Sequence, residues 1–159
     1  MTRLLWATFL AIAAHLIEEF VFPGGFLAWH RRYRPEHAAS IGPRFAVVAN
    51  GLMLLLVLAI AINGPASPFG IFQWLVLAAL LVTNAAFHLR AVVTTRIYSP
   101  GVVTAALLYV PLGVLGSAWL LRTGAVSAGT AAVAFLVGGS YPFISAALHR
   151  RRAALRKGA

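Results

Sequence analysis

Five long apolar segments set the limits on what this chain can fold into. They cover residues 4–22, 45–62, 71–93, 102–121 and 130–148, and helix-breaking residues such as Pro23, Pro65, Pro100 and Gly124 separate them. Each segment approaches the roughly 20 residues that a helix needs to cross the hydrocarbon core of a bilayer. We therefore predict an all-α polytopic membrane protein, a bundle of five transmembrane helices that forms a single domain over residues 1–159.

The composition of the chain supports this class. Hydrophobic residues make up 61% of the sequence and charged residues 10%, whereas a soluble domain is about 45–50% apolar and about 25% charged. A water-soluble domain and a disordered tail are therefore excluded. The chain has no Cys, which excludes disulfides and thiolate metal sites.

The net charge of +10 is explained by topology. Basic residues concentrate in alternate connections, and the side of the membrane that carries more of them faces the cytoplasm. We predict an outside N-terminus and a cytoplasmic C-terminus, with no nucleic-acid partner. The richer side holds Arg31, Arg32, Arg34, Arg44, Arg90, Arg96, Arg150, Arg151, Arg152, Arg156 and Lys157, and the other side holds Arg3 and Arg122.

The connection 26–44 mixes aromatic residues with arginines and histidines. Phe26, Trp29 and Tyr33 alternate with four arginines and with His30 and His37. Aromatic and basic side chains together are typical of a membrane interface. We interpret this segment as a basic, aromatic loop at the cytoplasmic interface, which anchors the protein; a site for a substrate headgroup is the alternative.

The most informative residues are acids inside the first apolar segment. A carboxylate in hydrocarbon costs about 2.5–3.5 kcal/mol on insertion scales, so such groups usually face the interior of a bundle and serve a function. His15 precedes Glu18 by three residues and Glu19 by four. At the period of an α-helix all three side chains lie on one face. The first segment thus offers one imidazole and two carboxylates to one cavity.

Other polar side chains lie at a similar depth in the remaining segments. Counted at 1.5 Å per residue from the predicted cytoplasmic end, His15 is about 10 Å deep and His88 about 7–8 Å. Asn84 lies one helical turn from His88. We predict that His15, Glu18, Glu19, Asn84 and His88 form a site in the cytoplasmic half of the membrane. Three residues are expected to support it or only to pack between helices: Asn50, Tyr109 and Tyr141.

The segment His15-Leu16-Ile17-Glu18-Glu19 resembles the motif that names the HXXEE-domain family. Asn84–His88 and Arg96–Gly101 are similar to later segments of that family, and the resemblance covers roughly residues 4–115. The family consists of uncharacterised bacterial integral membrane proteins that are suspected enzymes. The resemblance implies a location in the bacterial cytoplasmic (inner) membrane and a site at His15, Glu18, Glu19, Asn84 and His88. It implies no substrate.

Two chemistries fit an intramembrane enzyme that acts on a lipid-like or isoprenoid substrate. In the first, His15, His88 and one or both of Glu18 and Glu19 bind a divalent metal, zinc or iron, because two imidazoles and a carboxylate form an open catalytic set. In the second, the paired carboxylates act as general acid and general base without a metal. Either could isomerise, cyclise or hydrolyse an apolar molecule.

Functions other than these two kinds of catalysis also fit the sequence. Buried His and Glu occur in carriers of protons, so a proton or metal carrier, or a membrane protein that binds a small molecule without catalysis, is the main alternative. Haem ligation by His15 and His88 and a purely structural assembly factor are less favoured. The expected partner is a membrane lipid or an apolar small molecule, and no oligomeric state is predicted.

Overall fold

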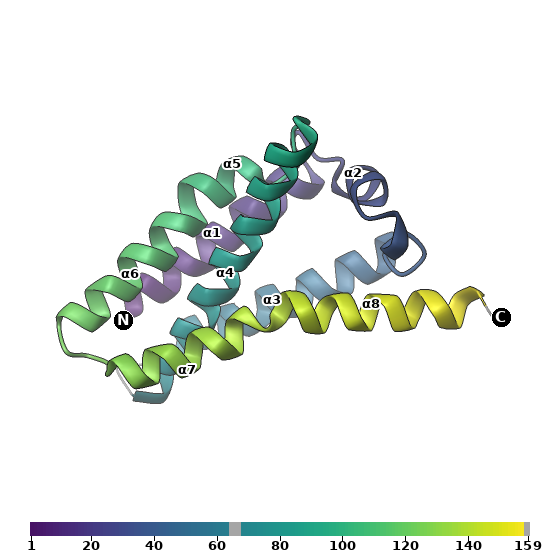
Figure 1. Ribbon diagram of the computed structural model, residues 1–159. Coiled ribbons are helices and arrows are strands. Elements are labelled where there is room, and N and C mark those ends of the chain that lie inside the picture. Colours follow the sequence, from purple (N-terminus) through teal and green to yellow (C-terminus); the bar gives the residue numbers. More distant parts are fainter. Residues whose placement is uncertain (64–67, 158–159) are drawn as a thin grey trace.

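The computed structural model describes residues 1–63 and 68–157, and every regular element in these ranges is helical (Figure 1). This agrees with the all-α prediction. The α-helices are α1 (Thr2–Phe20), α2 (Phe26–Tyr33), α3 (Pro43–Asn63), α4 (Pro68–Thr95), α5 (Val102–Thr104), α6 (Val110–Arg122), α7 (Ala128–Gly139) and α8 (Tyr141–Lys157). A 3₁₀ turn, η1 (Pro35–His37), follows α2, and a π-helical turn, η2 (Ala105–Tyr109), joins α5 to α6.

Four helical segments are long and apolar enough to cross a membrane. They are Pro43–Ile62, Pro68–Thr95, Val102–Arg122 and Ala128–Leu155, and they overlap the last four predicted spans. Helix α1 covers most of the first predicted span, 4–22, but its 19 residues include Arg3, Glu18 and Glu19. The chain is thus a multi-pass membrane protein by its helices, while the number of five spans stays a prediction.

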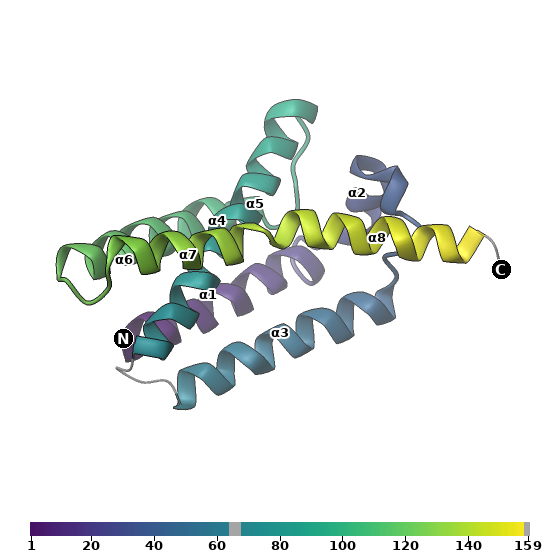
Figure 2. The same cartoon turned by 60° about the horizontal axis from the view of Figure 1, so that its bottom comes forward.

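The last predicted span, 130–148, corresponds to two helices instead of one. Helix α7 ends at Gly139 and α8 begins at Tyr141, with Ser140 between them. Pro142 has no backbone N–H to donate, so regular helical hydrogen bonding cannot continue through this point. Helix α8 then runs on to Lys157, well past the predicted end, and Figure 2 shows it extending beyond the other helices.

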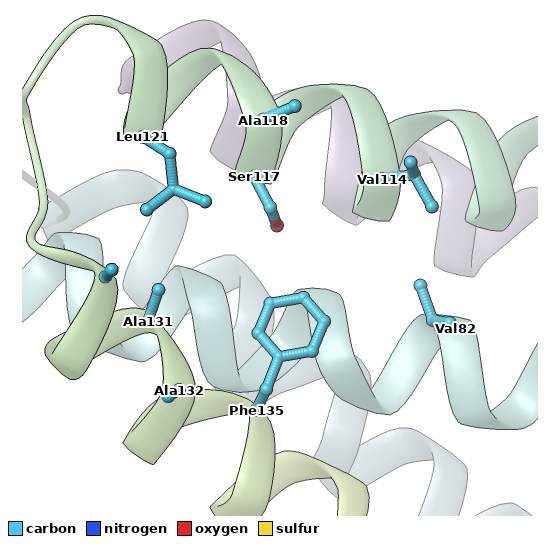
Figure 3. A pocket seen from close by; sticks show the side chains of 9 residues that line it. Val82, Val114, Ser117, Ala118, Leu121, Ala131, Ala132 and Phe135 are labelled. Atoms are coloured by element: carbon cyan, nitrogen blue, oxygen red, sulfur yellow. The ribbon is translucent and has the colours of Figure 1, made fainter.

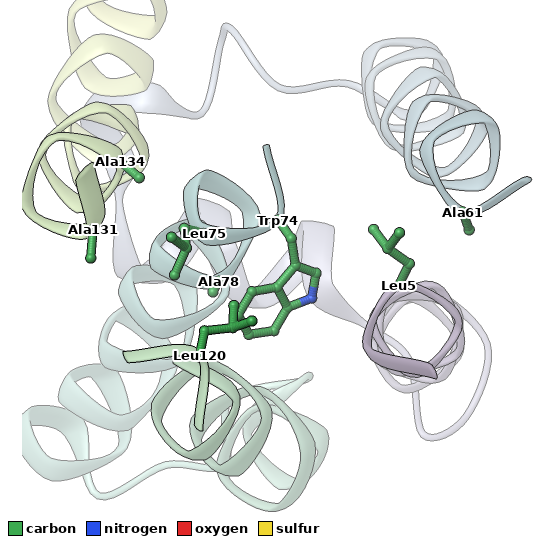
Figure 4. Close-up of a cluster of buried hydrophobic side chains, with 8 residues drawn as sticks. All are labelled: Leu5, Ala61, Trp74, Leu75, Ala78, Leu120, Ala131 and Ala134. Carbon is green, nitrogen blue, oxygen red and sulfur yellow. The ribbon is translucent and has the colours of Figure 1, made fainter. Parts of the chain in front are cut away.

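Helix α4 occupies the centre of the molecule. Trp74 is fully buried between α1, α4 and α6, and its indole N–H donates a hydrogen bond of 2.9 Å to the Thr8 hydroxyl on α1 (Figure 4). Gly138 lets α7 approach α4 closely, because a Cβ atom there would collide with the backbone carbonyl of Val76. Trp74 belongs to a cluster of buried hydrophobic side chains around α4, which comprises Leu5, Ala61, Trp74, Leu75, Ala78, Leu120, Ala131 and Ala134.

The connection 26–44, predicted as a loop, contains the short helix α2 and the turn η1. Sequence periodicity gives no signal for a helix of only eight residues, and α2 is fixed by packing of its aromatic face: the Trp29 ring stacks on His88 of α4, with centroids 5.9 Å apart. The other side of this segment meets α8. The rings of His37 and His149 stack with their centroids 5.4 Å apart. Next to this contact, the Arg152 guanidinium of α8 lies 4.1 Å from the centre of the Phe45 ring in α3.

Candidate metal centre

Three buried side chains from α1 and α4 converge on one point. The Oε1 atom of Glu19 lies 3.4 Å from Nε2 of His15 and 3.3 Å from Nε2 of His88. His15 and Glu19 are one helical turn apart on α1, so the regular helix aligns them. All three residues are at most 5% exposed. We call this set the His/Glu/His group; its ligand atoms lie within 4.8 Å of one another, so it could hold a metal ion.

Glu18, the other acid of the motif, does not join this group. Its carboxylate accepts hydrogen bonds from the backbone N–H groups of Val103 (3.0 Å) and Thr104 (2.7 Å), and from the hydroxyls of Thr104 (2.5 Å) and Tyr98 (2.6 Å). Four donors point at it, so the carboxylate is satisfied as an anion at the first turn of α5. Glu18 was predicted as a metal ligand; its oxygens instead bind the segment 98–104.

The hydroxyl of Thr104 determines which nitrogen of His15 carries the proton. Thr104 donates its hydroxyl proton to Glu18, because an ionised carboxylate has no proton to give. The same oxygen lies 2.9 Å from Nδ1 of His15 and must therefore accept a hydrogen bond from Nδ1–H. The proton of His15 is on Nδ1, and the lone pair of Nε2 faces the Glu19 carboxylate.

His88 is held in the same way by a different hydroxyl. Its Nδ1 atom lies 2.8 Å from the Ser99 Oγ atom, and both residues are fully buried. Its Nε2 atom, the one that faces Glu19, is left for another partner. Histidines that bind metals usually have their second nitrogen hydrogen-bonded to an oxygen in this manner, because the bond fixes the ring orientation and the tautomer.

The His/Glu/His group is electron-rich at its centre. Nε2 of His15 makes no hydrogen bond among the described residues, although it is buried. The atom nearest to it in the group is a carboxylate oxygen, which is also an acceptor. Two facing lone pairs at this distance repel unless a proton or a cation lies between them. The arrangement is therefore suited to bind a positive charge.

Gly101 closes one side of the group. Its φ of 98° lies in the left-handed region, and a Cβ atom there would come within 2.6 Å of Cε1 of His15 and 3.0 Å of Cε1 of His88. Only glycine combines this backbone conformation with such a close approach. Ser99 and Gly101 were not predicted as part of the site, because Ser99, Pro100 and Gly101 were interpreted as a break between two spans; the resemblance of Arg96–Gly101 to the family was the signal that could have identified them.

A π-helical turn and aromatic rings complete the walls. The turn η2 ends at Tyr109, whose ring lies 4.5 Å from the ring of His15. Tyr109 therefore packs against His15, and its supporting role stays a prediction. On the other side Phe26 and Trp29 of α2 pack against His88, with ring centroids at 6.2 Å and 5.9 Å. Trp29 was predicted only as an interface residue, and no spacing rule connects it to a residue 59 positions later.

Tyr98, the hydroxyl donor to Glu18, lies outside the membrane-spanning segments. Burial, together with its hydrogen bond to the Glu18 carboxylate, raises the pKa of the Tyr98 hydroxyl. Tyr98 therefore remains a neutral hydrogen-bond donor to Glu18 at any physiological pH.

The remaining predicted residues make no hydrogen bond to the His/Glu/His group within the described ranges. Asn84 is one turn before His88, and its buried Oδ1 atom has no hydrogen-bond partner in the described part of the chain. Asn50 has no hydrogen bond to the group among the residues described. Tyr141 begins α8 and is 44% exposed, so its predicted supporting role has no contact to rest on.

Comparison with known proteins gives one result. The chain matches the model of a family described as "Protein of unknown function with HXXEE motif" over residues 6–115, a range that contains the whole His/Glu/His group and the segment 98–104. Neither the curated proteins nor the solved structures contain a match to the chain.

Proposed function

The chain belongs to the HXXEE-motif family of proteins of unknown function, and from the geometry of that motif we propose that it is a membrane metalloenzyme. His15, Glu19 and His88 bind one divalent ion, zinc or iron, through Nε2, a carboxylate oxygen and Nε2. The single observation that carries this proposal is the unpartnered Nε2 lone pair of His15, which faces the Glu19 carboxylate at 3.4 Å.

The distances within the group support a metal. Bonds of about 2.0–2.1 Å at tetrahedral angles place two ligand atoms about 3.3–3.4 Å apart. The separations from Glu19 Oε1 to the two imidazole nitrogens are 3.4 Å and 3.3 Å. These two separations fit a metal bound by Glu19 and either imidazole, and the ligand atoms of all three residues lie within 4.8 Å of one another.

Three protein ligands support catalysis rather than a purely structural role. A structural zinc site is closed by four ligands, whereas two imidazoles and a carboxylate leave a coordination position for water or substrate. When bound, the metal supplies Lewis acidity toward an oxygen of the substrate. The residues of the chain contribute orientation: Glu18 and Thr104 hold His15, and Ser99 holds His88.

An apolar, lipid-like or isoprenoid molecule is the substrate class that we propose. Aromatic rings from Phe26, Trp29 and Tyr109 pack against the two histidines of the group. Hydrolysis, isomerisation or cyclisation of such a molecule fits a single Lewis-acid centre within apolar walls.

The membrane setting is part of the proposal. We propose that α1 is a fifth span, because both of its glutamates are buried inside the protein while Leu10 and Ile17 face outward, 62% and 54% exposed. The charge distribution of the sequence supports an outside N-terminus in the cytoplasmic membrane of a bacterium.

A metal-free acid–base enzyme is the second candidate, and one observation favours it. The same Glu19 oxygen lies within 3.4 Å of two imidazoles, so a proton could be shared between the carboxylate and either ring. The substrate class would be the same, with Glu19 and a histidine exchanging the proton.

Metal analysis of the purified protein separates the two candidates. Protein from cells supplied with zinc and iron should carry about one ion per chain by mass spectrometry of the metals. Glu19→Ala and His88→Ala should lose the ion. The control is His149→Ala. His149 lies on α8, outside the His/Glu/His group, and its Nδ1 atom is hydrogen-bonded to the Ser40 hydroxyl. If the parent protein carries no ion while infrared spectra show a protonated carboxyl that Glu19→Gln removes, the acid–base candidate replaces the metal.

The enzymatic part of the proposal has its own experiment. Membrane lipids from cells that produce the parent protein are compared by mass spectrometry with those from cells that produce Glu19→Ala at equal abundance. We expect an apolar compound that accumulates with one protein and not with the other. Identical lipid profiles with a metal-loaded parent would argue for a carrier or binding protein instead.

A further inference from the structure

A second site lies between α6 and α7, against Val82 of α4. It is a pocket of about 410 Å³, within the range of cavities that bind small molecules. Its walls are apolar: Val82 comes from α4, Val114 and Leu121 from α6, and Ala132 and Phe135 from α7 (Figure 3). None of the residues of the His/Glu/His group lines it, so it is a separate site.

One polar atom points into this apolar pocket. Ser117 is 6% exposed, and its hydroxyl makes no hydrogen bond within the described part of the chain. Figure 3 shows the hydroxyl directed from α6 into the space in front of Phe135. Other hydroxyls of the spans bond a carbonyl of their own helix, for example Thr8 to Leu4 and Thr123 to Trp119. Ser117 is therefore free to donate to a ligand.

The helices that form the pocket cannot simply close on it. A Cβ atom at Gly113 of α6 would lie 2.6 Å from the Val82 side chain, and one at Gly138 would collide with α4, so both helices already touch α4. The pocket lies between these two helices, with Phe135 of α7 across from Ser117 of α6 (Figure 3). The rim residues Val114, Leu121 and Phe135 are between 36% and 50% exposed, so the pocket opens sideways, toward the hydrocarbon of the membrane.

The position of Ser117 along α6 indicates the kind of ligand. Ser117 precedes Arg122, the last residue of α6, by five positions, or about 7–8 Å of helix. The headgroup and interfacial layer of a bilayer is about 5–8 Å deep on each side, so Ser117 lies near the level of the ester carbonyls of a phospholipid. Arg122, exposed at the end of α6, is a cation at the level of the phosphate.

We propose that this pocket binds one acyl chain of a phospholipid. The ester carbonyl accepts a hydrogen bond from the Ser117 hydroxyl, the chain runs between Val82 and Phe135, and the phosphate lies near Arg122. The ligand comes from the leaflet in which α6 ends. This binding site is independent of the metal centre and holds a lipid that is not consumed.

Photolabelling in nanodiscs tests the proposal. The probe is phosphatidylglycerol with a diazirine in the middle of one acyl chain, and labelled peptides are located by mass spectrometry. We expect labels to concentrate on α6 and α7 at the pocket. Ala132→Phe, which fills the pocket, should lower this labelling at least fivefold, and Ser117→Ala should lower it about threefold. Leu136→Phe is the matched control, because Leu136 lies on the same helix, 74% exposed and outside the pocket.

The outcomes are distinct. Labelling that is spread evenly over all apolar helices and does not change with Ala132→Phe would overturn the proposal and leave only ordinary boundary lipid. Labelling that falls equally in Leu136→Phe would also contradict a specific pocket. Ser117→Ala removes one oxygen atom and disturbs packing least, so its result stands even if Ala132→Phe fails to fold.

Discussion

Thr104 couples Glu18 to His15 through one hydroxyl group. It donates to Glu18 at 2.5 Å and accepts from His15 at 2.9 Å. Glu18 therefore acts on the centre only through Thr104, whereas Glu19 faces it directly. The motif places the two acids side by side in sequence, yet their surroundings give them different roles, one as an anchor for the segment 98–104 and one as a ligand.

Replacement of Thr104 tests this coupling. Thr104→Val keeps the shape but removes the hydroxyl, so the His15 ring loses the bond that sets its tautomer. We expect the affinity for Co²⁺ or Zn²⁺ to fall about 10- to 100-fold, the usual effect of losing an outer hydrogen bond to a metal ligand. Thr104→Ser should retain most of the affinity. Titration of the chelator-treated protein measures both, and equal affinities for the Val and Ser variants would contradict the coupling.

The two glutamates should respond oppositely to the same substitution. In metal-free protein, Glu19→Gln relieves the repulsion at Nε2 of His15, because the amide can donate to that lone pair; we expect an unchanged or higher melting temperature. Glu18→Gln turns an amide N–H₂ toward hydrogen-bond donors of the segment 98–104, and we expect the free energy of unfolding to fall by about 1–3 kcal/mol. Thermal unfolding after chelation compares them, and a melting temperature that falls equally in both variants would argue against separate roles.

Gly101 offers a test of the close approach itself. Gly101→Ala introduces a Cβ atom within 2.6 Å of His15 and 3.0 Å of His88 at a positive φ. Gly25→Ala is the matched control, since Gly25 has a similar φ of 89° but nothing within 4 Å of the added atom. We expect both variants to lose about 1 kcal/mol from backbone strain. Only Gly101→Ala should also lose metal binding, measured by the same titration.

At the scale of elements, the sequence predicts the long helices and misses the short ones. The predicted span 45–62 corresponds to α3, Pro43–Asn63, because a continuous apolar stretch in hydrocarbon has no alternative to a helix. Helix α2, by contrast, depends on Trp29 stacking upon His88. The break between α7 and α8 lies inside an apolar stretch. Hydropathy cannot predict it, because the missing backbone hydrogen bond of Pro142 does not change how apolar the stretch is.

The site shows the same division. His15 and Glu19 could be paired from helical periodicity, and His88 could be added from its depth. The partners of Glu18 could not, since Tyr98 and Thr104 lie 80 and 86 residues away and their contacts arise from tertiary packing. Ser99 and Gly101 could not be predicted either, because their sequence is also that of an ordinary turn.

The α2–η1 segment should lose stability in mild acid. Burial, with the charges of nearby His37, His149 and Arg34, lowers the pKa of His30 from 6.5 to about 4, and burial also lowers the pKa of His37. The unfolded segment therefore binds more protons between these values. Stability should be constant above about pH 6.5 and fall as the pH drops toward 4, by at most about 1.4 kcal/mol per pKa unit.

Melting temperatures of the parent and of His30→Leu, measured from pH 4 to 8, check this expectation. The variant has no titrating group at that position, so its melting temperature should depend less on pH. If both proteins show the same slope, another group is responsible for the acid sensitivity.

On the scale of the whole molecule, the basic segments gather at one end. The segment 26–44 and α8 meet through His37 and His149, and Arg152 of α8 lies over the ring of Phe45 in the first turn of α3. This contact brings two of the basic segments together, and the side of the membrane that they face stays a prediction from the charges.

Reporter fusions at the C-terminus test that sidedness. A green fluorescent protein fused after residue 159 should fluoresce, because it folds in the cytoplasm, and alkaline phosphatase at the same place should be inactive. A fusion of the phosphatase before residue 1 that is exported and active supports the odd number of spans. Active phosphatase at the C-terminus would reverse the orientation or the number of spans.

The long sequence separation between Glu18 and its donors has a consequence for biosynthesis. Helix α1 leaves the ribosome first, but the N–H groups of Val103 and Thr104 are made 85 and 86 residues later. At roughly 5–20 residues per second, Glu18 on the nascent α1 waits about 4–17 s for these donors. The segment translated first therefore completes its hydrogen bonds only after α5 has been made.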